Sequence, residues 1–381
     1  HPGSLAHLDP PPLIFSILGD LIAAGLNNNL LAYELSPGLT LLEESLCKWF
    51  AKKIGFNNDY SGGITASGGT LSNLNALIAA RNNAGLGSDS NCVLIVSDDA
   101  HSSFIKCIKI MGLDATNLVR IKTDNKGSMD IQNLRRTIDD CLIENKKIFA
   151  IVATLGTTVR GAIDPIKDIS DICKEKNIWL HIDGSIGGIF AVTSIPIEGL
   201  NNINQSNSIT INPQKIIGIT KTSSLLLVSD MSTLENTFST GLPYISTKED
   251  IINRGEIGIQ GSRPAEVIKL WLGLRFLGLN GIEKILKSSI KRKDFFLKNI
   301  SKNKFEIYSG PLHIVSFLPK GLPPKDTDLW TKNKVNDLMK NNFMLSRPKF
   351  RGKYFLRVVM GNYNTKESHI EELLKLLDTY Q

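Results

Sequence analysis

The chain has 381 residues, of which 42% are hydrophobic and 21% charged, as in an ordinary globular protein with one large and one small domain. Its net charge of +7 (44 Lys and Arg against 37 Asp and Glu) is spread along the sequence without a basic stripe, so we expect no nucleic-acid partner. No apolar run reaches the length of a membrane span and the first residues lack a signal-peptide pattern, so we expect no membrane association.

The cysteines form no CxxC pair and mostly fall within apolar patterns. This spacing predicts reduced core residues of a cytoplasmic protein, and we expect no metal site. The five residues are Cys47, Cys92, Cys107, Cys141 and Cys173.

The N-terminal part, residues 1–55, is predicted to be an extended and helical segment. Residues 1–12 are rich in proline, and a helix is expected from about Leu13. Ser36 and Pro37 have the residue types of an N-cap and a first helical position, so a second helix should begin there. Packing of both helices against the large domain is sufficient to explain their apolar faces.

A glycine turn precedes the next predicted helix. Ser67, Gly68, Gly69 and Thr70 lead directly into an amphipathic run at residues 71–80. Free backbone N–H groups at a helix N-terminus bind anions, and glycine lets a phosphate approach the backbone. The spacing is neither that of a P-loop nor that of a dinucleotide fingerprint, which argues against a nucleotide. An ordinary loop and helix cap is the other interpretation of this turn alone.

From residue 62 onward, apolar runs of strand length alternate with helical periodicity. This alternation predicts an α/β fold in which helices cover both faces of a mainly parallel sheet. We predict roughly seven strands in a large domain at residues 56–280, including residues 93–96, 118–121, 148–153, 178–182, 208–212 and 224–228.

Two charged residues follow strand ends in this domain. Asp183 comes directly after the run 178–182, and Lys215 follows the run 208–212. In open parallel sheets, ligands bind beyond the carboxyl ends of the strands. A carboxylate can keep a pyridine nitrogen protonated, and a desolvated lysine amine can form a Schiff base with an aldehyde. Pyridoxal 5'-phosphate (PLP) carries both groups, so the pair predicts a PLP site. Taken singly, Asp183 fits a helix N-cap and Lys215 a surface charge.

Several ordered blocks together resemble the group II PLP-dependent decarboxylases, which include glutamate, aromatic amino acid and 2,4-diaminobutyrate decarboxylases. The blocks are TASGGTLSNLNALIAAR, SDDAHSSFIKCIKIMGL, ATLGTTVRGAIDPI, WLHIDGSIGG, NPQK and FLRVVMGNYNT. They follow the family's order across nearly the whole chain. The resemblance implies the PLP-dependent fold type I. The block at residues 1–13 resembles an internal family block that usually follows a helical segment, so the chain is either trimmed or departs from the family there.

The resemblance also implies roles for residues of these blocks. His101 would stack on the cofactor ring and orient the substrate carboxylate, although a lone histidine at a strand end is more often structural. Thr158 would lie near the ring, with a core threonine as the alternative, and His181 would orient Asp183. Phosphate contacts are expected from Gly68, Gly69 and Thr70, and further cofactor contacts from Ser185, Asn212 and Gln214.

Two of these positions depart from the family pattern. Gln214 replaces a histidine, which removes a positive phosphate contact and keeps a hydrogen-bond donor. Gly184 and Ser185 replace an alanine pair, which loosens packing on the second face of the ring. Both changes bear on affinity more than on the type of reaction.

The segment 237–263 has little periodicity and resembles a functional loop of the family, shorter than usual. It contains Tyr244, which in the family reaches the neighbouring subunit's active site; a simple loop anchor is the alternative. A homodimer with a composite active site is therefore expected.

Residues 281–381 alternate again and predict a small C-terminal α+β domain, with strands at 314–318 and 355–360 and helices at 327–340 and 366–378. Arg357 lies in the second strand. It is either a clamp for the substrate carboxylate or part of a structural salt bridge.

Taken together, these patterns predict decarboxylation of an L-amino acid to the amine, through a Schiff base at Lys215 and a ring-stabilised carbanion. Either Tyr244 or Lys215 would return the proton to the α-carbon. Two alternatives stay open: another PLP-dependent reaction such as oxidative deamination to an aldehyde, and an inactive relative kept as a scaffold.

Overall fold

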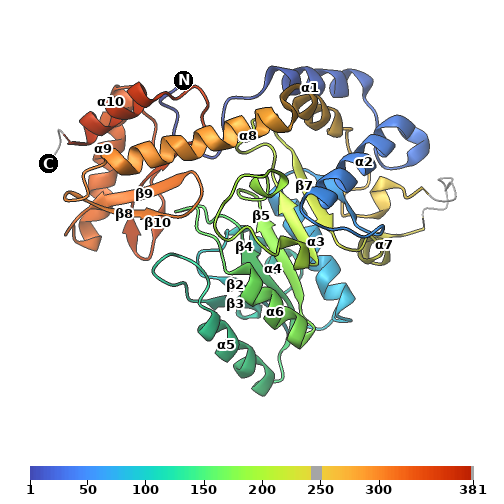
Figure 1. Ribbon diagram of the computed structural model, residues 1–381. Helices are drawn as coiled ribbons and strands as arrows, with labels where there is room; N and C mark the ends of the chain where they lie inside the picture. Colours follow the sequence, from blue (N-terminus) through green and yellow to red (C-terminus); the bar gives the residue numbers. More distant parts are fainter. Residues whose placement is uncertain (242–250, 379–381) are drawn as a thin grey trace.

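A computed structural model describes residues 1–241 and 251–378 (Figure 1). The large domain is built on a seven-stranded sheet in the order β1-β7-β6-β5-β4-β2-β3. The strands are β1 (Gly62–Ala66), β2 (Cys92–Ser97), β3 (Leu118–Ile121), β4 (Lys147–Thr154), β5 (Trp179–Gly184), β6 (Ser208–Ile211) and β7 (Ser224–Val228).

The predicted mainly parallel sheet is confirmed. Strands β3, β2, β4, β5 and β6 run parallel to one another, whereas β7 is antiparallel to both of its neighbours, β6 and β1. The carboxyl ends of β2, β4, β5 and β6 therefore meet at one edge of the sheet.

Helices cover both faces of this sheet because successive strand residues point to opposite sides. In β4, Ala150 and Val152 pack with residues of α3 and α4, whereas Ile151 and Ala153 pack with residues of α5 and α6. The helices are α3 (Gly69–Asn83), α4 (Ser103–Ile110), α5 (Ile131–Ile143), α6 (Ile166–Lys176) and α7 (Ser232–Phe238).

A long helix connects the two domains. Helix α8 (Val267–Asn299) begins beside α1 (Ile14–Leu26), near α2 (Pro37–Lys53), and extends into the small domain (Figure 1). Gly278, with φ 59° and ψ 175°, interrupts its helical geometry. The predicted domain boundary at residue 280 stays a prediction.

The small domain contains a three-stranded antiparallel sheet, a two-stranded ribbon and two helices. Its elements are β8 (Phe305–Ser309), β9 (Ile314–Pro319), α9 (Thr327–Lys340), β10 (Lys349–Phe350), β11 (Lys353–Tyr354), β12 (Leu356–Val359) and α10 (Glu367–Asp378). The sequence patterns predicted β9, β12 and both helices and did not predict β8 or the ribbon. Short 3-10 helices lie at Tyr33–Leu35, Ala115–Asn117, Phe190–Val192, Ile203–Gln205, Arg254–Glu256 and Pro324–Asp326.

The first residues of the chain join the small domain. Leu5 is fully buried in the hydrophobic core of that domain, and its carbonyl accepts a hydrogen bond from the backbone N–H of Val359 at 2.8 Å. The extended N-terminal stretch thus lies far in sequence from the elements that it stabilises.

Candidate active site

A cavity of about 260 Å³ lies at the carboxyl ends of the central strands. It brings together most of the residues singled out in the sequence: Gly68, Gly69, Thr70, His101, Thr158, Asp183, Ser185, Asn212, Gln214 and Lys215. Ser67, from the same glycine turn, also lines the cavity, and the lining residues that the sequence patterns missed are Asn73, Thr154, Gly156, Thr157 and Ile186.

Asp183 is the buried anion of this cavity. It lies near the end of β5, and its Oδ1 accepts a hydrogen bond from the backbone N–H of Ser185 at 3.1 Å. Burial by itself would raise its pKa, but Lys215, Ser185, His101 and His181 together hold the pKa below its usual value. Asp183 is therefore ionised at neutral pH.

Lys215 lies in the turn after β6, where its backbone N–H donates to the Asn212 carbonyl at 3.1 Å. Burial lowers the pKa of its amine, and the negative charge of Asp183 partly opposes that change. A larger fraction of the amine is consequently uncharged and nucleophilic near neutral pH than for a solvated lysine.

His101 follows the end of β2 and faces the same cavity. Its Nδ1 accepts a hydrogen bond from the backbone N–H of Ser103 at 3.1 Å, which leaves Nε2 to carry the ring proton of the neutral form. Desolvation lowers the pKa of His101, with Asp183 acting in the opposite direction. The neutral ring is thus favoured.

The glycine turn closes the other end of the cavity. Gly68, at φ 97° and ψ 159°, precedes helix α3, whose first N–H groups lack intrahelical acceptors. A Cβ at Gly69 would lie 2.6 Å from Asn212 Nδ2 and 2.8 Å from Ser185 Oγ, so these polar side chains approach the helix closely only because the residue is glycine.

The cavity fits PLP by its own chemistry. It combines an ionised carboxylate, a lysine amine of lowered pKa and a helix N-terminus suited to a phosphate. Two of its buried polar atoms, Asn73 Nδ2 and Thr154 Oγ1, have no hydrogen-bond partner among residues 1–241 and 251–378. Such atoms are free to bond a ligand.

His181 was expected to orient Asp183, but its ring nitrogens form hydrogen bonds with other side chains. Its Nδ1 lies 2.8 Å from Ser208 Oγ and its Nε2 lies 3.1 Å from Asn73 Oδ1, so both ring nitrogens are occupied beneath the cavity. His181 therefore orients Asn73, a lining residue that the sequence patterns missed.

Two further predicted residues, Arg357 and Tyr244, are not among the residues that line the cavity as described. Arg357 is not part of the cavity lining, and its guanidinium donates to the carbonyls of Thr158 at 2.6 Å and Ala6 at 3.0 Å and to Ser346 Oγ at 2.9 Å. Tyr244 falls outside the described residues. Their roles toward the substrate stay predictions.

A family model described as the pyridoxal-dependent decarboxylase conserved domain matches residues 6–318. The chain belongs to this family. An aromatic-L-amino-acid decarboxylase of Bacillus atrophaeus is 29% identical, over 99% of this chain and 80% of the relative. An L-aspartate decarboxylase of Metarhizium robertsii is 28% identical, over 95% and 76%. The crystal structure of mouse CSAD in apo form is 25% identical with a TM-score of 0.92, covering 100% of this chain and 84% of that one.

Family membership and fold together define the enzyme class. The protein has the PLP-dependent fold type I, uses PLP and is a carboxy-lyase that decarboxylates an amino acid. Within the part of the chain that the structure describes, no helix is long and apolar enough to cross a membrane. No cluster of three or more His, Cys, Asp or Glu side chains suited to a metal occurs among those same residues.

Proposed function

We propose that Lys215, Asp183 and His101 carry the decarboxylation of an L-amino acid to its amine. The observation that supports this most directly is their convergence in one cavity with the N-terminus of α3. When bound, PLP withdraws the electron pair that the departing carboxylate leaves on the α-carbon.

Each residue has a distinct task in this proposal. Asp183 stays ionised and stabilises a protonated ring nitrogen by charge. Lys215 would hold the cofactor aldehyde through its uncharged amine, and its Nζ could also carry a proton in the site. His101 places its neutral ring against the cofactor and orients the substrate carboxylate.

The remaining lining residues hold the cofactor in this proposal. Gly68, Gly69 and Thr70 bind the phosphate through the backbone of the turn. The ring and phosphate would be surrounded by Thr158, Ser185, Asn212 and Gln214. Two of these side chains are already held by hydrogen bonds. Asn212 Oδ1 accepts from Ser224 Oγ at 2.6 Å, and Gln214 Oε1 accepts from the Ser223 N–H at 2.6 Å.

A homodimer is proposed because α1 exposes an unusual face. Its buried residues are the small Ser16, Gly19 and Ala23, which let α1 approach α8 so closely that a Cβ on Gly19 would lie 2.5 Å from the Lys269 Cα. Its large apolar residues are exposed, although Phe15 also stacks on Phe276 of α8: Ile14, Phe15, Ile17, Leu18, Leu21, Ile22 and Leu26. A patch of this kind marks an interface, and we assign it to a second copy of the chain. Tyr244 would then complete the partner's site.

A cytoplasmic location is also proposed. All five cysteines are buried and free, as suits a reducing compartment. Thiol titration of protein denatured without reductant should find five reactive groups, and a lower number would argue for disulfides.

The function is tested by incubating the PLP-loaded protein with each L-amino acid and measuring carbon dioxide and amine. At least one substrate should release both in equal amounts. Borohydride reduction should attach PLP to the peptide that contains Lys215, and Lys215→Ala should abolish both attachment and turnover. Lys221→Ala is the matched control, because Lys221 is an exposed lysine paired with Asp9.

The other outcomes of this experiment contradict the proposal in different ways. Peroxide with ammonia would indicate oxidative deamination. Attachment at Lys215 without turnover of any amino acid would favour an inactive scaffold, and attachment at Lys221 would refute the assignment of the lysine.

A further inference from the structure

The loop between β4 and α6 connects the active site to the small domain. Its inner side presents Thr157 and Thr158 to the cavity. Its outer side offers three consecutive carbonyls to small-domain donors: Thr158 O accepts from Arg357, Val159 O from Ser316 Oγ and Arg160 O from the Gly310 N–H. The position of this loop therefore depends on the position of the small domain.

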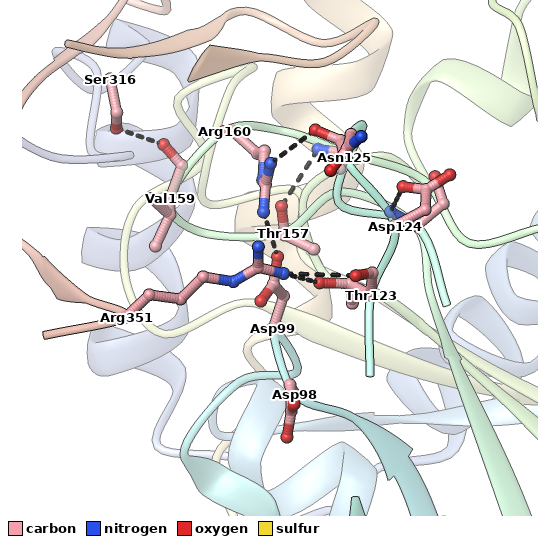
Figure 2. Close-up of polar contacts among 12 residues, drawn as sticks. Asp98, Asp99, Thr123, Asp124, Asn125, Thr157, Val159, Arg160, Ser316 and Arg351 are labelled. Atoms are coloured by element: carbon pink, nitrogen blue, oxygen red, sulfur yellow. Dashed lines mark hydrogen bonds and ion pairs between the residues drawn. The ribbon is translucent and has the colours of Figure 1, made fainter. Parts of the chain in front are cut away.

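The side chain of Arg160 extends this connection to a second active-site loop. Its Nη2 forms an ion pair with Asp99 Oδ2 at 2.8 Å, and its Nη1 donates to the carbonyl of Asn125 at 3.3 Å (Figure 2). Asp99 lies two residues before His101, in the turn that follows β2. The guanidinium thus joins the His101 turn and the Thr157–Thr158 loop, which line the cavity from different strands.

The surroundings of Arg160 hold its side chain in one place. It is 2% exposed, and its guanidinium carbon lies 5.1 Å from the ring centroid of Phe350 and 5.8 Å from that of Tyr308, both in the small domain. On another side, a Cβ at Gly127 would lie 2.3 Å from Arg160 Nε, so only a glycine permits this approach. The arginine side chain therefore contacts two neighbouring loops of the large domain, the Asp99 turn and the loop with Asn125 and Gly127, and two aromatic rings of the small domain.

Stability alone gives no reason for a charge pair at this position. Taking two ions out of water costs about as much as their attraction returns, so buried pairs are weak evidence of stabilisation. Their better attested effect is to fix one geometry among competing ones. Here the geometry that is fixed is the distance between the His101 turn and the Thr157–Thr158 loop.

We propose that Asp99 and Arg160 are positioning residues, which set the ring of His101 against the cofactor and couple that placement to the small domain. This inference rests on the proposed role of His101. Neither residue lines the cavity of the active site, so both act through the two loops and not on the reacting atoms.

A double-mutant cycle tests the proposal. The variants are Arg160→Met, His101→Ala and the double variant, each loaded with PLP. Three quantities are measured for each: kcat/KM, the PLP affinity from an absorbance titration, and the circular dichroism in the visible band of the cofactor. Arg160→Met should lower kcat/KM about 10- to 100-fold and change the visible signal. In the His101→Ala background, the same substitution should lower kcat/KM less than threefold, because residues that act through one another are not additive.

Arg120→Met is the matched control. Arg120 lies in β3, is exposed, and its Nη1 donates to the Asp98 carbonyl of the same turn at 3.4 Å; among the described residues it has no hydrogen bond or ion pair to the Thr157–Thr158 loop. This variant should stay within threefold of the wild type in kcat/KM and keep the visible signal.

Failure of the inference and failure of the proposed His101 role give different results. If His101→Ala alone leaves the visible signal, affinity and turnover unchanged, the role of His101 is refuted. If His101→Ala lowers kcat/KM and Arg160→Met lowers it by the same factor with or without His101, the positioning role is refuted. The same holds if Arg160→Met keeps the visible circular dichroism signal of the wild type. If Arg160→Met does not fold, Asp99→Asn/Arg160→Met, which leaves no unpaired charge, replaces it in the cycle under the same criteria.

Discussion

At the scale of single residues, the site depends on a buried neutral histidine beneath the cofactor cavity. His181 is fully buried, and burial lowers its pKa from 6.5 to about 4, with Asp183 opposing the change. The lowered pKa makes the neutral ring the folded form, in which Nε2 donates to Asn73 Oδ1 and Nδ1 accepts from Ser208 Oγ. Protonation would place a positive charge at a fully buried position.

This gives a pH dependence of stability. Below pH 6.5 the unfolded chain binds a proton at His181 that the folded chain does not bind. The contribution of His181 to the free energy of unfolding is therefore fully present above pH 6.5 and is lost as the pH falls toward 4. Between pH 7 and pH 5 the loss should be about 2 kcal/mol. Urea unfolding of the wild type and His181→Gln measures it: the variant should lose less stability over this range. The exposed His7→Gln is the control and should follow the wild type; a parallel loss in all three proteins would contradict the prediction.

At the scale of elements, the turn from β1 into α3 determines how closely the phosphate group of PLP could approach the backbone. Gly68 has φ and ψ values that are essentially restricted to glycine, although among the described residues beyond its two chain neighbours no atom lies within 4 Å of a Cβ built on it. A side chain there would act through backbone strain rather than through a clash, and would displace the N–H groups of the first turn of the helix.

We expect Gly68→Ala to weaken PLP binding at least tenfold while the protein stays folded, since such strain costs about 1–3 kcal/mol. Gly85→Ala is the matched control: Gly85 also has positive φ (71°) and open space around its Cβ position, but it follows the C-terminus of α3. It should lower the melting temperature without changing PLP affinity. Equal affinity of Gly68→Ala and the wild type would argue against a phosphate at this turn.

At the scale of the whole molecule, the outward apolar face of α1 is the strongest sign of a partner. Ile14 and Leu21 are 72% and 68% exposed, so substituting them should not disturb the core of the monomer. Ile14→Glu/Leu21→Glu should convert a particle of twice the chain mass into one of the chain mass in sedimentation analysis, because charges cannot be buried in an apolar interface without partners. Ile143→Glu, at an equally exposed isoleucine of α5, is the control and should stay dimeric. A double variant that remains dimeric would place the interface elsewhere.

The composite site is tested by mixing two inactive proteins. Lys215→Ala lacks the lysine of its own site, and Tyr244→Phe lacks the tyrosine that is proposed to serve the neighbouring site. If each site takes one residue from each chain, heterodimers formed by subunit exchange should regain some activity. Exchange without recovered activity would mean that Tyr244 serves its own subunit or anchors its loop.

Local patterns were sufficient to predict the sheet and the residues at its edge. Alternation of apolar runs with helical periodicity placed Asp183 and Lys215 at the ends of β5 and β6, and parallel strands necessarily bring such ends together. The glycine turn before α3 was readable for the same reason, since its conformation is set by neighbouring residues.

Tertiary structure alone decided which distant groups meet. Arg160 and Asp99 are 61 positions apart, and Arg357 bonds to Thr158 across 199 positions. Such contacts depend on the order of the strands in the sheet and on where the small domain packs, which a local pattern does not contain. The sequence by itself determined the chemistry at the strand ends, because strand and helix periods are local properties. The structure decided how the His101 turn, the Thr157–Thr158 loop and the small domain are held together, because those distances arise only when elements far apart in the chain pack.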